Sequence, residues 1–221
     1  MLGVLAAVGV CAFGDAGVSA SAALDPGAIP NVAFPLATFG RFSPAKGQWV
    51  EYQMVAHGAS KSQTIRVASI GKSVVRGETL EQVEVLASGE KEILTVFWVK
   101  RAAGEPDRLR RVALWVKPNA ALAVPLDQAF SSDSDRGEPT GASVSRQLSI
   151  PLGKISTELS EFKAKKGTSR VWISDAVPVF SVAKLDLPGE TWTAVRLGTG
   201  AETGLTVVPM TVPRVSGANE K

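Results

Sequence analysis

Residues 170–184, RVWISDAVPVFSVAK, decide how the rest of the chain is interpreted. Residues 171–173 are consecutively apolar, and a strand sends alternate side chains to opposite faces, so both faces of a strand here need cover. A polar break at Ser174 and Asp175 separates this run from a second apolar run at residues 179–183. We predict an interior strand that ends before Pro178, because proline cannot donate a hydrogen bond to a sheet.

The same kind of short apolar run recurs along the chain, with polar or glycine-bearing turns between the runs. The predicted strands are residues 48–55, 64–70, 79–86, 93–99, 109–116, 145–152, 155–162, 170–173, 191–197 and 205–208. Such close spacing is typical of an antiparallel meander and leaves no room for crossover helices. Residues 119–130 are a helix candidate that Pro125 interrupts, so we expect a loop with a helical turn there.

Composition favours one globular domain without a nucleic-acid partner. The chain has 221 residues, of which 45% are hydrophobic and 20% charged, with a net charge of +3. That length and apolar content suffice for one full core. Lysine and arginine are interleaved with aspartate and glutamate, so no basic surface for nucleic acid is expected.

The first 22 residues have the features of a signal peptide. Residues 2–14 are almost wholly apolar but too short to span a bilayer, and Ala20 or Ala22 suits signal peptidase. Cleavage there would remove Cys11, the only cysteine, and leave no transmembrane segment in the mature chain. Lipidation of Cys11 is disfavoured because the bulky Val10 precedes it. We therefore predict a periplasmic or secreted protein whose stability depends on its core, without disulfides.

The remaining chain divides into three parts. Residues 23–46 contain four prolines and are expected as an extended arm, residues 47–208 as a single antiparallel β domain, and residues 209–221 as a polar tail. Within the domain, residues 131–143 are predicted as a polar loop. Asp133 and Asp135 have the spacing that opens a calcium loop, but the later glycine and glutamate are missing, so no metal site is expected.

Few residues suggest catalysis. His57 is the only histidine, it lies in a turn pattern, and the sequence marks neither a nucleophile nor an orienting acid for it. We therefore expect no catalytic residue, no cofactor and no enzymatic activity. A hydrolase that uses His57 is the third-ranked interpretation.

Aromatic residues suggest a different kind of site. Residues 93–99 are apolar on both faces, so a second layer covers one face or that face lines a hydrophobic cavity. Plain core packing is the alternative for each aromatic residue. The candidate ligand-binding residues are Tyr52, Met54, Trp98, Trp115, Trp172 and Phe180.

Several blocks resemble a group of uncharacterised bacterial periplasmic proteins that look akin to the lipoprotein-carrier superfamily, LolA-like and LppX-like. The blocks are GQWVEY at residues 47–52, a strand ending in IGK at residues 65–72, VWISDAVP at residues 171–178 with Lys184 after it, and GTG at residues 198–200. They occur in order from residue 47 to residue 208. One position departs from the pattern, because Ser181 stands where these proteins usually have glycine.

The resemblance implies a mainly β fold, a strongly curved antiparallel sheet or half-barrel with short helices or loops over its open side. It also implies that acyl chains or other lipids are held in the hollow. We therefore expect an exported, non-catalytic protein that binds an apolar or lipid-like ligand. The alternative is a structural or protein-interaction module of the envelope, with a protein partner and no ligand.

Overall fold

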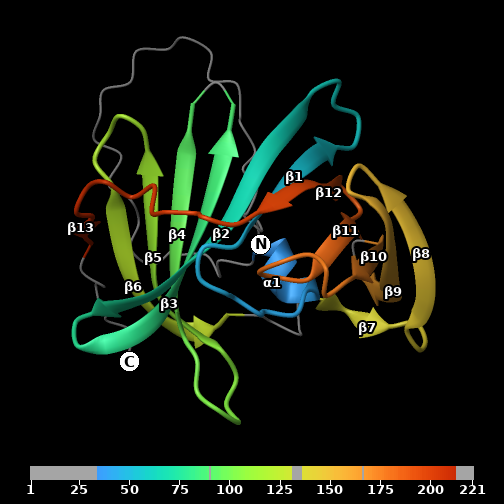
Figure 1. Ribbon diagram of the computed structural model, residues 1–221, viewed down its shortest axis with the longest axis horizontal. Coiled ribbons are helices and arrows are strands. Elements are labelled where there is room, and N and C mark those ends of the chain that lie inside the picture. Colours follow the sequence, from blue (N-terminus) through green and yellow to red (C-terminus); the bar gives the residue numbers. More distant parts are fainter. Residues whose placement is uncertain (1–33, 90, 131–135, 166, 213–221) are drawn as a thin grey trace, which may run out of the picture.

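A computed structural model describes residues 34–89, 91–130, 136–165 and 167–212, and one large sheet dominates it (Figure 1). The elements are α1 (Pro35–Phe39), β1 (Trp49–Ala56), β2 (Ser62–Val75), β3 (Glu78–Ser88), β4 (Ile93–Lys100), β5 (Arg108–Val116), β6 (Leu122–Ala129), β7 (Glu138–Pro139), β8 (Val144–Ile150), β9 (Gly153–Ala164), β10 (Gly167–Ile173), β11 (Val182–Asp186), β12 (Glu190–Gly198) and β13 (Met210–Thr211). The prediction of a mainly β, curved sheet with little helix is confirmed.

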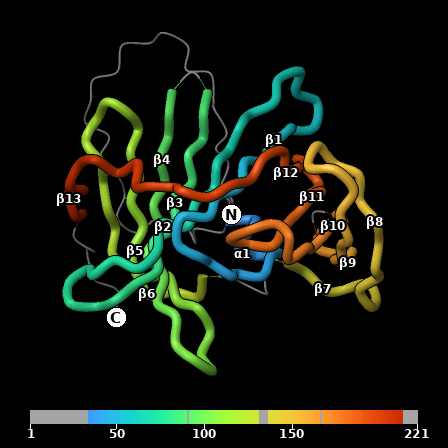
Figure 2. The backbone as a smooth tube through the Cα atoms, in the orientation of Figure 1, coloured from blue at the N-terminus to red at the C-terminus, as the bar shows by residue number. Residues whose placement is uncertain are grey.

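The strands follow the order β13-β6-β5-β4-β3-β2-β1-β12-β11-β10-β9-β7, and β8 pairs with β9 beside β7. From β1 to β5 the sheet is the antiparallel meander that the sequence predicts, and β6 continues it. The chain then returns to pair β12 with the other side of β1. The backbone trace shows how this return brings the C-terminal third of the chain beside the N-terminal strands (Figure 2). The sheet does not close on itself.

The sheet has an inner face and an outer face, each with its own apolar cluster. On β4, Phe97 and Val99 belong to the larger inner cluster, whereas Val96 and Trp98 belong to the smaller outer one. The period-two alternation of a strand produces this division. It explains why residues 93–99 are apolar on both faces of the strand, with Thr95 as the one exception.

Part of the expected N-terminal arm, residues 34–39, packs into the core of the domain. Pro35 opens α1, where its fixed φ suits the first turn of a helix. Leu36 is fully buried in the inner cluster, and α1 lies next to β11 (Figure 1). After α1 the backbone of Arg41 donates to the Phe180 carbonyl at 2.8 Å, and Ser43 forms a bridge with Val179.

Besides β7 inside the expected loop at residues 131–143 and β13 inside the expected tail at residues 209–221, two sequence predictions of local structure are wrong. Residues 119–130 hold strand β6 in place of the expected loop with a helical turn. Pro125 is accommodated because it faces Arg111, beside an irregularity of β5 where the ladder is already broken. Residues 205–208 are not a strand, because the chain there crosses the outer face; the terminal strand is β13, which pairs in parallel with Leu122 and Ala123.

Strand β10 contains residues 170–173, which were predicted as an interior strand. It lies between β9 and β11 and ends before Ser174 as predicted. Val171 and Ile173 are buried in the inner cluster. Trp172 is only partly buried, with the Lys184 ammonium 4.8 Å from its ring centre. Val171 and Ile173 are therefore fully covered by other residues, whereas Trp172 is only partly covered.

Candidate functional site

The inner face is the candidate site, and one part of it is filled by residues 34–42, which we call the filling segment. Its phenylalanines stack on the sheet and on the turn before β11. Phe34 lies 5.5 Å from Phe97 and 5.4 Å from Phe180, and Phe42 lies 5.1 Å from Phe130, measured between ring centres. Aromatic pairs at these distances pack favourably. Side chains of the protein itself therefore occupy this part of the inner face.

Tyr52 and Trp192 line the floor beneath the filling segment. The Tyr52 hydroxyl donates to the Val182 carbonyl at 2.9 Å, and its ring lies 6.1 Å from that of Trp192. Tyr52 is fully buried, and burial raises the pKa of its phenol well above the usual value. The side chain is thus a neutral, hydrogen-bonded member of the core.

Arginines hold the filling segment to its surroundings. The Arg136 guanidinium donates to the Thr38 carbonyl at 2.9 and 2.6 Å. Arg41 forms ion pairs with Glu158 on β9 and, at 3.5 Å, with Asp175 in the turn after β10. Exposed ion pairs contribute little individually, so the aromatic packing dominates the energy of this contact.

A second part of the inner face is not filled by any residue that the structure describes. This part is formed by one end each of β4, β5 and β6. Ile93 faces Val116 there, and Leu114 faces both Thr95 and Leu122. Leu114 is 48% exposed, and its neighbours on this face are partly exposed. We call this set the open strip: Ile93, Thr95, Leu114, Val116 and Leu122. It begins two residues along β4 from Phe97, which Phe34 covers.

The six predicted ligand-binding residues do not line one surface. Tyr52, Met54 and Phe180 lie together in the inner cluster. Trp98 and Trp115 lie on the outer face, under the C-terminal segment. Trp172, partly buried on β10, packs against the margin of the inner cluster. The sequence did not predict the open strip, because alternating apolar residues on neighbouring strands are also what a covered sheet face shows.

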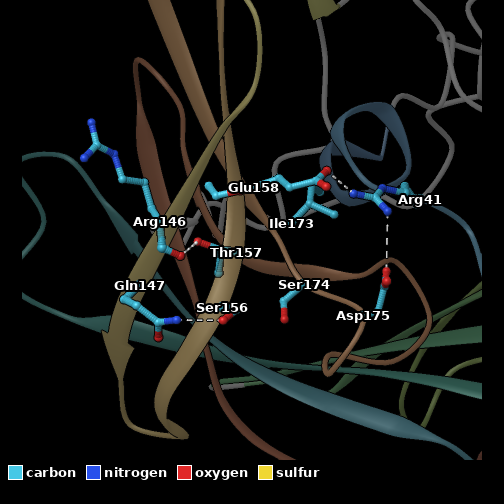
Figure 3. Close-up of a pocket in the computed structure, with 10 residues that line it drawn as sticks. Arg41, Arg146, Gln147, Ser156, Thr157, Glu158, Ile173, Ser174 and Asp175 are labelled. Carbon is cyan, nitrogen blue, oxygen red and sulfur yellow. Dashed lines mark hydrogen bonds and ion pairs between the residues drawn. The ribbon is translucent and has the colours of Figure 1, made fainter.

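Two larger pockets are open and mainly polar. The first measures about 380 Å³ and is lined by residues of β8, β9 and the turn after β10, together with Arg41. Figure 3 shows Arg41 between Glu158 and Asp175, with the Arg146 side chain pointing away. Because Arg41 is already paired with two carboxylates, it has little free capacity for an anion.

The second pocket, of about 400 Å³, contains His57 with Arg170, Lys184, Asp186 and Thr191 among its lining residues. The His57 ring places Nδ1 3.1 Å from the Pro188 carbonyl and Nε2 3.4 Å from the Thr191 hydroxyl. A carbonyl can only accept, so Nδ1 carries a proton and donates to it. Within the described residues no carboxylate is hydrogen-bonded to the ring, so the acid of a catalytic triad is missing there.

Neither a metal centre nor a membrane helix is found in the part of the chain that the structure describes. No group of three or more His, Cys, Asp or Glu side chains there could hold a metal ion. No helix among those residues is long and apolar enough to cross a membrane. The calcium-loop candidates Asp133 and Asp135, the signal peptide and Cys11 lie outside the described residues.

No protein-family model matches the chain, and no curated protein matches it.

Proposed function

We propose that the protein is an exported, non-catalytic binding protein that takes an apolar or lipid-like ligand, such as an acyl chain, on the inner face of its sheet. The observation that carries the proposal is the open strip. Leu114 is 48% exposed at the centre of an apolar surface that continues directly into the aromatic cluster. Contiguous exposed apolar surface of this kind is a common feature of sites for apolar ligands.

The filling segment limits how much ligand the inner face can take. An acyl chain on the open strip would end against Phe34 and Phe97, unless the filling segment moves away. The segment includes a helix of only five residues, without a side-chain cap. A ligand longer than the strip would thus compete with residues 34–42 for the same floor.

A fluorescent fatty-acid displacement assay tests the proposal. Leu114→Asp puts a charge at the centre of the open strip on a side chain that is already half exposed, so folding should survive. Val74→Asp is the matched control, because Val74 is exposed at the far end of β2. We expect at least tenfold weaker binding for Leu114→Asp and unchanged binding for Val74→Asp. Equal affinity in both variants, or no binding by the wild-type chain, would contradict the proposal.

The second candidate function is an envelope module that binds a protein partner and no lipid. The filled part of the inner face favours it, because aromatic side chains already occupy the space that a carrier would leave free. Native mass spectrometry of protein purified from its own host separates the two functions. A co-purifying lipid mass supports lipid binding, and a bare chain that still captures an envelope protein supports the module.

Export is tested separately. The intact mass of the mature protein should correspond to a chain that begins at Ser21 or Ala23. A chain that retains Met1, or one carrying acyl groups on Cys11, would contradict simple secretion.

A further inference from the structure

Strand β8 has one edge that no other strand covers. It pairs with β9 over all seven of its residues, in a register without irregularities. In the part of the chain that the structure describes, no backbone hydrogen bond joins β8 to a strand other than β9, although β8 also comes near β12. An unpaired edge presents a row of free N–H and C=O groups to any strand that approaches.

Of the usual protections of such an edge, β8 has only one charged side chain, Arg146. Natural sheets blunt their edges with lysine, proline, bulges or very short strands. The sheet ends at β7 and β13 are two-residue strands. By contrast, β8 contains neither lysine nor proline, and five of its seven residues are exposed. Long, regular and exposed, it is suited to pairing with another strand.

The sequence of β8 indicates which strand would pair with it. Its residues are VSRQLSI, and their chemistry is nearly symmetric about Gln147. In an antiparallel pair of two copies centred there, Val144 faces Ile150, Ser145 faces Ser149, and Gln147 faces its own copy. Apolar and hydroxyl pairs of this kind stabilise neighbouring strands. Arg146, the one charged residue, faces Leu148 and is not directly opposite a like charge.

We propose that β8 is a self-association edge, at which two copies of the chain pair antiparallel about a twofold axis through Gln147. Such an axis makes the same patch contact itself, as most soluble dimers do. The Gln147 amide donates to Ser156 Oγ at 2.6 Å, and this leaves its carbonyl oxygen free to accept across the axis. One strand pair buries less surface than a stable dimer needs, so the association is weak and depends on concentration.

Sedimentation velocity over a concentration series tests the pairing. Gln147→Lys places two ammonium groups opposite each other at the axis and should leave the protein monomeric where the wild-type chain dimerises. Gln53→Lys is the matched control. Gln53 is also exposed on a strand and also donates to a serine, Ser62 Oγ at 3.0 Å, but β1 is paired on both sides. This control should dimerise like the wild type.

Cysteine cross-linking tests the register in a Cys11→Ser background. Gln147→Cys should form a disulfide-linked dimer on oxidation, because opposite residues of paired strands are within disulfide reach. Ser145→Cys should not, because its two copies would lie about 14 Å apart along the strands. A wild-type chain that stays monomeric up to its solubility limit would overturn the proposal. So would a dimer that survives Gln147→Lys, or cross-linking at residue 145 without cross-linking at residue 147.

Discussion

The Glu84 carboxylate on the outer face accepts a hydrogen bond from the backbone N–H of Gly204 at 2.7 Å. The same carboxylate accepts from the Thr203 hydroxyl at 2.5 Å and from the Gln82 amide at 2.9 Å. Glu84 is buried, and burying a charge is costly unless hydrogen bonds compensate it. These three hydrogen bonds therefore compensate the burial of the carboxylate, and two of them hold residues 203–204 against the sheet.

We expect Glu84→Gln to loosen this contact. The amide nitrogen of glutamine cannot accept, so one of the three donors loses its acceptor and the remaining bonds lose their charge assistance. The free energy of unfolding should fall by about 1.5–3 kcal/mol in a urea melt. Hydrogen exchange should rise in residues 201–212. Glu202→Gln, an exposed change in the same segment, should have almost no effect. Equal stability of the two variants would contradict the anchoring role.

A second prediction concerns the turn that joins β10 to β11. Ser181 has φ of 56° and Val179 has φ of 71°, both in the left-handed region. A residue with a Cβ pays about 1–2 kcal/mol there, whereas glycine does not. Ser181→Gly should raise the free energy of unfolding by about 0.5–1 kcal/mol after the greater entropy loss of glycine. Ser149→Gly, in the regular strand β8, should lower it by a similar amount. A loss of stability on Ser181→Gly would mean that the serine side chain matters more than the backbone strain.

The Ser181 backbone also shows what the sequence could and could not predict. The resemblance singled out this position because the proteins that the chain resembles usually have glycine there, and the left-handed φ of Ser181 is one that glycine adopts without strain. Alternation likewise predicted most strands, since the two-residue period is visible locally. Alternation could not tell that Trp98 and Trp115 face away from Tyr52, because which face is inner depends on the return of β12 to β1.

The open strip was beyond the sequence for a related reason. The apolar residues on alternate positions of β4, β5 and β6 are what a buried sheet face would show. Phe97 is covered because Phe34 of the filling segment packs on it, whereas Leu114 remains exposed. Strand β6 was missed because residues 119–130 were interpreted as a helix candidate that Pro125 interrupts, and whether a strand tolerates Pro125 depends on an irregularity in the neighbouring β5.

The third prediction compares two tryptophans. Trp192 is buried and packs against Phe34 and Tyr52, whereas Trp172 is partly exposed beside Lys184. Trp192→Ala should lower the free energy of unfolding by about 3–5 kcal/mol, as buried aromatic truncations do. Trp172→Ala should cost about 1–2 kcal/mol because less apolar area leaves water. Urea melts measure both, and a larger cost at Trp172 would restore that residue to the centre of the fold.

The fourth prediction concerns His57. Its ring links the turn after β1 to the turn before β12 through the Pro188 carbonyl and the Thr191 hydroxyl. His57→Ala should lower the free energy of unfolding by about 1 kcal/mol, the usual net value of such bonds. Fatty-acid binding should be unchanged, since the open strip lies elsewhere on the sheet. Loss of a measured hydrolytic activity in this variant would instead support the enzyme interpretation.

The last prediction uses Tyr52, the only tyrosine of the chain, so tyrosinate absorbance reports this residue alone. Burial raises the pKa of its phenol above the ordinary 10.0 of an unfolded chain. Above pH 10 the folded protein keeps a proton that the unfolded chain releases. Unfolding therefore becomes easier as pH rises, whereas below pH 10 Tyr52 makes no pH-dependent contribution.

Wild-type stability should fall above pH 10 by about 1.4 kcal/mol per pH unit more steeply than that of Tyr52→Phe. At neutral pH the variant should be about 1 kcal/mol less stable, because the Val182 carbonyl loses its partner. Urea melts from pH 9 to pH 11.5 measure both effects. Tyrosinate absorbance should appear only together with unfolding. If Tyr52 instead titrates near pH 10 while the protein remains folded, the floor of the inner face is open to water and the filling segment does not seal it.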